Sequence, residues 1–489
     1  MVPWSAFGQA AGSPRKGGIL RTSFPSAPDT PDPHMTLSGP GQVMSGAIFE
    51  NLTELDPNDQ PAPRLATRWT SEKGASEWIF DLRTGVKFHH GREMTSEDVV
   101  ATINRSEDRS LGLRSAGAFG PIKEAKAEGS SRVRLVLTQP CAELPALVAN
   151  RYAKIIPADK LATIASDPMG TGPFKFKSFQ PGTGAEVERN AGYWMPDRPY
   201  LDGIRFVTIA QSIAQQAALR GNTVDMLEFL SADGLLPLKG APGVRAHSVI
   251  VAQYYTLMTQ ANLAPFDNPK VRQAFKHILD RESLVASALL GEGSIANDTT
   301  LAPGNPYLSA LPQYGQDLPK AQSLLREAGV NNLALELYTS SERQPSPKIA
   351  IAFKEAAEKI GIGITIRDVP FTEYLANVAR KKPLYTSQWN DRVTLYESLY
   401  QIYYSKSPFN YSGVEQYPGL DRQLEDLIAE LDLEQRKKRA ADVLTTIHAY
   451  GDRIIPFFMN YMCATSQKVQ AFIPPKHGAS ELRDVWLSA

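Results

Sequence analysis

The sequence predicts an α/β protein built from roughly three structural units. Its 489 residues are about three times the length of a typical domain of about 150 residues. Short stretches in the first part of the chain show the alternation of apolar residues that is typical of strands. In the second half, amphipathic helices alternate with strands, which indicates α/β organisation. Hydrophobic residues make up 42% of the chain, enough to form a core in each unit.

The strand pattern is clearest in the first third of the chain. Residues 18–23 (GILRTS) predict a short strand, which a proline-rich segment follows. In EWIFDL, the alternating residues Trp78, Phe80 and Leu82 predict a strand with one buried face. Residues 132–139 (RVRLVLTQ) alternate in the same way and predict a further strand.

Two helix starts carry capping signals. Thr95 and Asp98 have the spacing of a capping box ahead of an apolar run. Asn268 suits the N-cap of a second helix, and Pro269 suits its first position, where the missing N–H costs nothing. Further helices are predicted at residues 318–328, 347–360 and 422–450, and the stretch GIGITIRDVP after the second of these predicts a strand.

Charge and cysteine content exclude several classes of protein. Lys plus Arg and Asp plus Glu both number 52, and this balance argues against a nucleic-acid partner, which requires a basic face. No stretch approaches the roughly 18 uncharged apolar residues of a membrane span. The two cysteines, Cys141 and Cys463, exclude a disulfide scaffold. Two unpaired buried thiols are favoured over one long-range disulfide.

The N-terminal residues 1–16 are expected to be the remnant of an export signal, or else disordered. Small residues from Gly8 to Gly12 follow a short apolar stretch, which resembles the end of such a signal. No cysteine follows the small residues, which argues against a lipid anchor there. Export would place the protein in the periplasm.

No motif of catalysis or metal binding is present. The sequence lacks a GxSxG elbow, a GxxxxGK[ST] phosphate loop and an HExxH helix. His89 and Glu93 have helical metal-ligand spacing, but Gly91 between them favours a turn. The sequence therefore predicts a protein that is not an enzyme and that has no cofactor, no catalytic residues and no metal site.

Four segments of the chain are distinctive when they are taken together. They are FDLRTGVKFHHGREMTSEDVVATI, DPMGTGPFKFKSFQPGTGAEVERNAGYWMPDRPYLDGIRF, PFDNPKVRQAFKHILDRESLV and FNYSGVEQYPGLDRQLEDL. These segments resemble the extracellular solute-binding proteins of family 5, the periplasmic receptors of peptide, opine and nickel ABC transporters. The resemblance extends from about residue 18 to the C-terminus, and the second segment is its most specific part.

The resemblance implies a two-lobe α/β periplasmic-binding-protein fold (type II, cluster C) that closes on a solute by a hinge motion. It implies an extra subdomain in the first lobe, as is typical of this group. The implied boundaries are residues 17–49, 171–256 and 464–489 for the main part of lobe 1, residues 50–170 for the extra subdomain, and residues 257–463 for lobe 2.

The geometry of the family also implies three stretches at the solute site. They follow the first strand, surround the first crossing between the lobes, and surround the WNDR sequence. The implied ligand-binding residues are Phe24, Asp29 and His34, then Tyr254, Tyr255 and Gln260, and finally Trp389, Asn390, Asp391, Arg392 and Tyr411.

The WNDR stretch is the most informative about the solute. Peptide receptors of this family tend to show Trp-x-x-Asp, in which the aspartate pairs with the amino terminus of the peptide. With Trp389 fixing the register, Arg392 stands at the anchor position, and a guanidinium there favours a carboxylate or phosphate. A shift of one residue would restore Asp391 to the anchoring role. Gln260 also replaces the usual asparagine of the family, which further weakens the case for an ordinary oligopeptide.

The favoured function is therefore delivery of a small carboxylated solute (an opine, a sugar-conjugated amino acid or a short peptide-like compound) to an ABC importer. The implied partners are the permease and ATPase subunits, and the protein is expected to be a monomer. Alternatives within the same fold are an oligopeptide or dipeptide receptor, a protein that feeds a chemoreceptor, and a nickel or oligosaccharide binder.

Overall fold

The structure, a computed structural model, describes residues 12–489 and divides into two compact units. Unit 1 comprises the chain up to Val249 together with Tyr461–Ala489, and unit 2 comprises Ile250–Asn460. The export-signal interpretation falls mainly on residues 1–11, which lie outside the described residues. Within residues 12–489, no helix is long and apolar enough to cross a membrane.

The main sheet of unit 1 is built around the first strand of the chain. Strand β1 pairs in parallel with β10 on one side and with β11 on the other. Antiparallel β9 and β8 extend the sheet beyond β10, and helix α1 packs on them. The bounds are β1 (Ile19–Phe24), α1 (Gly39–Ile48), β8 (Phe174–Gln180), β9 (Gly184–Arg189), β10 (Gly203–Thr208) and β11 (Met226–Leu227).

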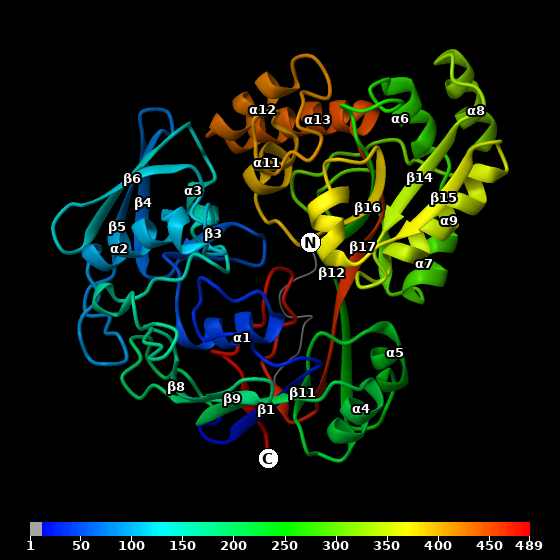
Figure 1. Cartoon of the computed structure of the whole chain (residues 1–489). Helices are drawn as coiled ribbons and strands as arrows, with labels where there is room; N and C mark the ends of the chain where they lie inside the picture. The colour runs from blue at the N-terminus through cyan, green and yellow to red at the C-terminus, as the bar shows by residue number, and fades with distance from the viewer. Residues whose placement is uncertain (1–11) are drawn as a thin grey trace. The chain divides into compact units, whose positions relative to one another are not determined.

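Unit 1 also contains a four-stranded antiparallel sheet in the order β4-β5-β7-β6. Figure 1 shows this sheet with helix α2 beside it, in blue and cyan. Trp78, Phe80 and Leu82 of β5 are buried, as their alternation predicts. The capping box of Thr95 and Asp98 at the start of α2 is confirmed. The bounds are β4 (Ala66–Glu72), β5 (Glu77–Leu82), α2 (Ser96–Glu107), β6 (Ile122–Ala127) and β7 (Arg132–Leu137).

Shorter elements complete unit 1. Cys141 and Cys463 are buried thiols that form no disulfide. The prediction that favoured two buried thiols over one long-range disulfide is therefore confirmed. The remaining helices and strands are β2 (Thr53–Leu55), β3 (Pro61–Pro63), α3 (Leu144–Leu147), α4 (Ser212–Arg220), α5 (Ala232–Leu235), β18 (Val469–Gln470) and β19 (Trp486–Leu487), with 3-10 turns at Arg109–Leu111, Ala158–Lys160 and Leu236–Leu238.

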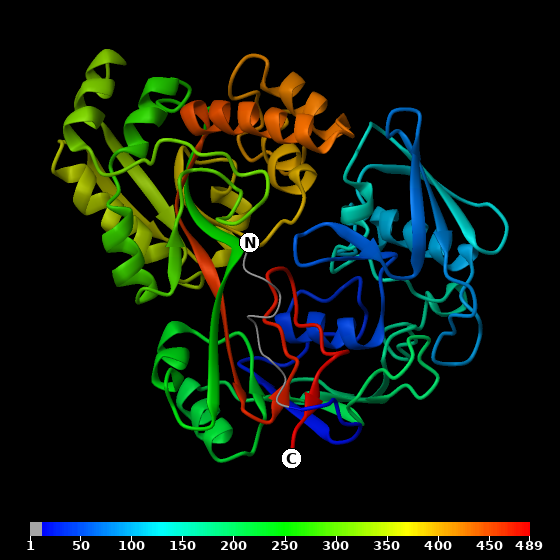
Figure 2. The same ribbon diagram turned by 180° about the vertical axis from the view of Figure 1, so that it is seen from behind.

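The sheet of unit 2 has the order β15-β14-β16-β12-β17, and short β13 pairs with β17. Strands β14, β15 and β16 are parallel, whereas β12 runs antiparallel to β16. In Figure 2 the long strands β12 (green) and β17 (orange to red) run alongside each other, and each contains residues of both units. The bounds are β12 (Val244–Thr259), β13 (Gly293–Ile295), β14 (Ala334–Thr339), β15 (Gly363–Asp368), β16 (Leu384–Trp389) and β17 (Arg453–Ser466).

Helices surround this sheet and bury a large apolar core. Helix α9 packs on β14, β15 and β16, and its residue Phe353 lies in the core with Leu337 and Phe457. Asn268 caps α6 by accepting a hydrogen bond from the backbone N–H of Lys270, as predicted. The helices are α6 (Pro269–Lys276), α7 (Arg281–Leu289), α8 (Leu318–Glu327), α9 (Ser346–Glu358), α10 (Phe371–Glu373), α11 (Gln401–Tyr403), α12 (Leu420–Ala429) and α13 (Leu433–Tyr450), with π-helical turns at Tyr374–Val378 and Tyr396–Tyr400.

The single helix predicted at residues 422–450 is two helices, α12 and α13. Glu430 has an extended backbone, which ends α12. Asp432 then acts as the N-cap of α13, because its side chain accepts a hydrogen bond from the backbone N–H of Gln435 at 2.8 Å. A local aspartate cap therefore begins a new helix where the apolar pattern alone continues.

Candidate functional site

Trp389 is the last residue of β16 and therefore lies where the chain leaves the sheet. It lies opposite Tyr254 of β12 in the antiparallel register. The chain then turns into a helical segment at Thr394. There Glu397 donates its backbone N–H to the Thr394 hydroxyl at 3.1 Å, and its carboxylate accepts a hydrogen bond from that hydroxyl at 3.2 Å. This local cap fixes the short WNDR connection between strand and helix.

Arg392 lies between two aromatic side chains. Its guanidinium carbon is 5.3 Å from the ring centroid of Trp389 and 5.1 Å from that of Phe409. One terminal nitrogen donates to the side-chain oxygen of Gln401 at 2.7 Å and to the carbonyl of Glu397 at 3.3 Å. The side chain is half-buried, so these contacts hold a permanent positive charge at the boundary with solvent.

Arg453, which the sequence reasoning missed, also contacts the ring of Trp389. Its guanidinium carbon lies 5.4 Å from the Trp389 ring centroid and 4.8 Å from that of Tyr403. The residue is 1% exposed and donates to the adjacent Asp452 carboxylate at 2.7 Å. Burial lowers the pKa of Arg453, but the charge of Asp452 and the neighbouring phenols outweigh it, so the pKa is raised. We call Tyr254, Trp389, Tyr403, Asp452 and Arg453 the Arg453 cluster.

Tyr411 and Gln260 lie beside Trp389. The ring of Tyr411 packs edge-on against Trp389 with centroids 4.9 Å apart. The Gln260 amide donates to the carbonyl of Tyr411, and its oxygen accepts from the hydroxyl of Tyr385 at 2.9 Å. Because both ends of the amide are hydrogen-bonded and the residue is buried, Gln260 orients the loop that carries Tyr411.

The remaining predicted residues of unit 2 differ in their environments. Tyr254 is 1% exposed and packs edge-on against Phe458, whereas Tyr255 belongs to the apolar core of the unit. Asn390 is exposed and Asp391 is half-buried, in the irregular segment directly after Trp389. The structure thus brings Tyr254, Trp389, Arg392 and Tyr411 together.

The three predicted residues of unit 1 are engaged in contacts within that unit, Phe24 and His34 in its interior and Asp29 in an exposed loop. Phe24 is buried in its core and stacks on Phe206. Asp29 accepts hydrogen bonds from the backbone N–H groups of Leu37 and Ser38, and this network holds its own loop. Burial raises the pKa of Asp29, but the hydrogen bond from the Thr36 hydroxyl, together with those from Leu37 and Ser38, lowers it below the ordinary value.

His34 is also committed to the interior of unit 1. It is completely buried and donates from Nε2 to the carbonyl of Lys154 at 2.8 Å, while Nδ1 accepts from Arg105 at 2.7 Å. Burial is the largest cause that lowers the pKa of His34 to about 4. The imidazole is therefore neutral and fully hydrogen-bonded at neutral pH. Within residues 12–489, no three His, Cys, Asp or Glu side chains gather as a metal site.

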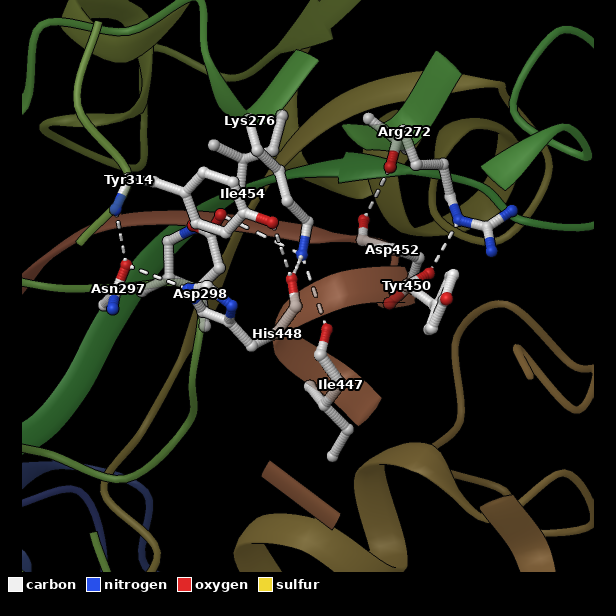
Figure 3. A network of polar contacts seen from close by, with 12 residues as sticks. Arg272, Lys276, Asn297, Asp298, Tyr314, Ile447, His448, Tyr450, Asp452 and Ile454 are labelled. Atoms are coloured by element: carbon white, nitrogen blue, oxygen red, sulfur yellow. Dashed lines mark hydrogen bonds and ion pairs between the residues drawn. The ribbon is translucent and has the colours of Figure 1, made fainter. Parts of the chain in front are cut away.

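A second set of buried charges in unit 2 surrounds Lys276 (Figure 3). Lys276 donates to the carbonyls of His448 and Ile447 at 2.7 and 3.4 Å, at the end of α13. Its ammonium lies 4.0 Å from the carboxylate of Asp298. Arg281 donates two hydrogen bonds to the same carboxylate, at 2.8 and 3.0 Å. We call Lys276, Arg281, Asp298, Ile447 and His448 the Lys276 network.

The Lys276 network is electrostatically coupled. Burial is the largest cause that lowers the pKa of Lys276 to about 8, and the charges of Arg281 and Arg272 add to it, whereas Asp298 opposes it. Carbonyls at a helix C-terminus carry partial negative charge, which suits a buried ammonium. These contacts join α6, α7 and α13, so the network is structural.

Comparison with known proteins identifies the family. The model of the bacterial extracellular solute-binding proteins, family 5, matches residues 60–411. The glutathione-binding protein GsiB of Shigella boydii is 26% identical over 360 residues, which are 72% of this chain and 70% of the relative.

Two solved structures share the fold. The periplasmic binding protein DppA of Helicobacter pylori, in complex with the peptide STSA, superposes with a TM-score of 0.82 at 22% identity, covering 97% of this chain and 99% of that one. AgaA of A. tumefaciens R10, in complex with agropinic acid, gives a TM-score of 0.82 at 22% identity, covering 96% and 99%. The α/β fold predicted from the resemblance is confirmed. The chain belongs to the bacterial extracellular solute-binding proteins of family 5.

Proposed function

We propose that this protein binds a small carboxylated solute, namely an opine, a sugar-conjugated amino acid or a short peptide-like compound. The single observation that carries the proposal is the guanidinium of Arg392, held half-buried between Trp389 and Phe409. A guanidinium held in this way binds a carboxylate with little further loss of rotamer freedom, and its fork matches the geometry of a carboxylate.

The charge around Trp389 supports an acidic rather than a basic solute group. Arg392 and Arg453 both lie within 5.5 Å of the Trp389 ring centroid, at 5.3 and 5.4 Å. The charge of Arg453 is balanced by its ion pair with Asp452, whereas Arg392, the neighbour of Asp391 in the chain, repels the ammonium that an aspartate anchor would take. We therefore retain Arg392, rather than Asp391, as the anchor. The compounds named for the three similar proteins, glutathione, the peptide STSA and agropinic acid, all carry a carboxyl group.

The proposed physiological role is delivery of this solute in the periplasm to the permease and ATPase of an ABC importer, without catalysis. Family membership supports this role, because the family consists of extracellular solute-binding proteins. Closure of the protein on its solute would then be driven by the difference in affinity between its open and closed forms. Small-angle scattering with and without the solute measures the expected compaction.

A thermal-shift screen tests the solute class. Glutathione, agropinic acid, dipeptides and sugar acids are compared with the corresponding amides, in which the carboxylate is neutralised. We expect a rise in melting temperature with one or more acids and no rise with their amides, because ligand binding to the folded state alone stabilises it. An equal rise with acid and amide, or binding of free amines only, would contradict the carboxylate proposal.

A further inference from the structure

Several polar atoms of the Arg453 cluster have no hydrogen-bonding partner within residues 12–489. Such atoms are uncommon inside proteins, because a buried donor that loses its water partner is costly to leave unpaired. Their presence around one guanidinium therefore requires an explanation. They are Nε and Nη2 of Arg453, the hydroxyls of Tyr254 and Tyr403, Nε1 of Trp389 and Oδ2 of Asp452.

These atoms belong to side chains that contact one another. The Arg453 guanidinium lies 4.8 Å from the ring centroid of Tyr403 and 5.4 Å from that of Trp389. Tyr254 stands opposite Trp389 in the sheet, and Asp452 receives a hydrogen bond from Nη1 of Arg453 at 2.7 Å. Strands β12, β16 and β17 and helix α11 thus each contribute to one buried cluster.

The cluster is rich in donors, and the positive charge of Arg453 is paired with the carboxylate of Asp452. Five of its six unpaired atoms are N–H or O–H donors, and the sixth is a carboxylate oxygen. Nε and Nη2 form one edge of the guanidinium, and this edge binds a carboxylate through two parallel hydrogen bonds. The five donors outnumber the one acceptor, so the set favours an acceptor group, such as an anion, at this edge of the guanidinium.

The most accessible part of the cluster is Trp389. It is 6% exposed, whereas Tyr254 and Arg453 are 1% exposed and Tyr403 is completely buried. The half-buried Arg392 also contacts the indole, with its guanidinium carbon 5.3 Å from the ring centroid. An anion would therefore reach Arg453 past Trp389, next to the proposed anchor.

We propose that Arg453, Tyr254, Tyr403 and the indole N–H of Trp389 form an inner anion subsite that holds one small negatively charged group. The group is either a second carboxylate of the solute or a free inorganic anion such as chloride. The first source rests on the proposed function, whereas the anion subsite itself does not.

Bromide is the direct probe of the inner anion subsite. Crystals of the full chain grown in sodium bromide are expected to show an anomalous peak in contact with Nε and Nη2 of Arg453. Replacing both Tyr254 and Tyr403 by Phe removes two donors and keeps the rings. Each donor to an anion is worth about tenfold in affinity, so the double variant should bind bromide about 100-fold more weakly.

Tyr374→Phe is the matched control, because its hydroxyl already donates to the carbonyl of Thr386 in the same unit. It should leave bromide affinity unchanged. A peak at Arg453 that is equally strong in the double variant would mean an adventitious ion only and would overturn the proposal. Water density alone at this place, with no anomalous signal, would also overturn it.

Competition identifies the source of the anion. If glutathione or agropinic acid displaces bromide from Arg453, the subsite takes a carboxylate of the solute. If the acid binds while bromide stays, the subsite holds a free anion. Bromide at Arg453 without binding of any acid in the thermal-shift screen would remove the proposed function and leave the subsite. Binding of an acid without bromide at Arg453 would remove the subsite alone.

Discussion

Lys276 and Arg453 are both buried cations of unit 2, but their surroundings differ. Lys276 donates hydrogen bonds to two carbonyls at the end of α13, and its ammonium lies 4.0 Å from the carboxylate of Asp298. Arg453 donates only to Asp452 within residues 12–489 and leaves two nitrogens without an acceptor. A cation whose donors are paired inside the unit stabilises the fold. A cation with unpaired donors next to a half-buried arginine and a tryptophan is suited to bind a partner from outside.

The largest expected effect is the loss of stability when the counter-charge of the Lys276 network is removed. Asp298 is completely buried and accepts from Arg281 and from the backbone N–H of Ile455. Asp298→Asn leaves two buried cations without a counter-charge and should lower the free energy of unfolding by about 3–5 kcal/mol. Urea denaturation measures it. Asp280→Asn is the control, because asparagine caps α7 as well as aspartate does. A loss within 1 kcal/mol of the control would show that the network is not structural.

The pH dependence of stability should separate Lys276 from Arg453. Lys276 has a pKa of about 8 in the folded protein, below the ordinary value of about 10.4. Between these values the unfolded chain binds more protons, so the free energy of unfolding should rise with pH from about 8. Lys276→Met should reduce the rise by on the order of 2 kcal/mol between about pH 7.5 and 10. Denaturant unfolding at several pH values in this range measures the free energy of unfolding of the natural protein and of Lys276→Met. Parallel dependences on pH for the two proteins would contradict the low pKa of Lys276.

Trp389 should matter for binding as well as for packing. Trp389→Ala removes the ring that contacts both Arg392 and Arg453, and it should weaken binding of a carboxylated solute by about 1–3 kcal/mol. Tyr417→Ala is the aromatic control, since Tyr417 is an exposed ring that stacks on Tyr450 with centroids 4.5 Å apart. Calorimetry measures both. If Trp389→Ala lowers only the thermal stability and leaves the affinity intact, Trp389 is a core residue.

The smallest expected effect compares two tyrosine hydroxyls. Tyr374 donates to a buried carbonyl at 2.7 Å, so Tyr374→Phe should cost about 1 kcal/mol of stability without ligand. The hydroxyl of Tyr403 has no partner within residues 12–489, so Tyr403→Phe should be neutral or slightly stabilising in protein freed of small anions. Equal losses in thermal melts would show that the Tyr403 hydroxyl is paired in solution.

Local chemistry was predictable from the sequence, whereas contacts between distant residues were not. The capping residues of α2 and α6 act within four residues, so their pattern is visible in the sequence. The break at Asp432 has the same local cause but lies inside a continuous apolar pattern that concealed it. Arg453 opens an apolar strand and carries no motif, because its neighbour Trp389 is 64 positions away in the chain. His34 was predicted to bind the solute, but its ring nitrogens are hydrogen-bonded to Lys154 and Arg105. These residues are distant in the chain, so the contacts depend on tertiary packing.

Calorimetry with the Arg392→Ala variant and a matched control shows whether Arg392 anchors a carboxylate of the solute. The acid with the largest thermal shift is titrated into the natural protein, Arg392→Ala and Arg343→Ala. Arg343 is an exposed arginine of unit 2 that also lies over an aromatic ring. Its guanidinium carbon is 3.6 Å from the ring centroid of Phe371. We expect a loss of about 2–5 kcal/mol of binding free energy for Arg392→Ala and almost none for Arg343→Ala. An unchanged dissociation constant for Arg392→Ala would contradict it.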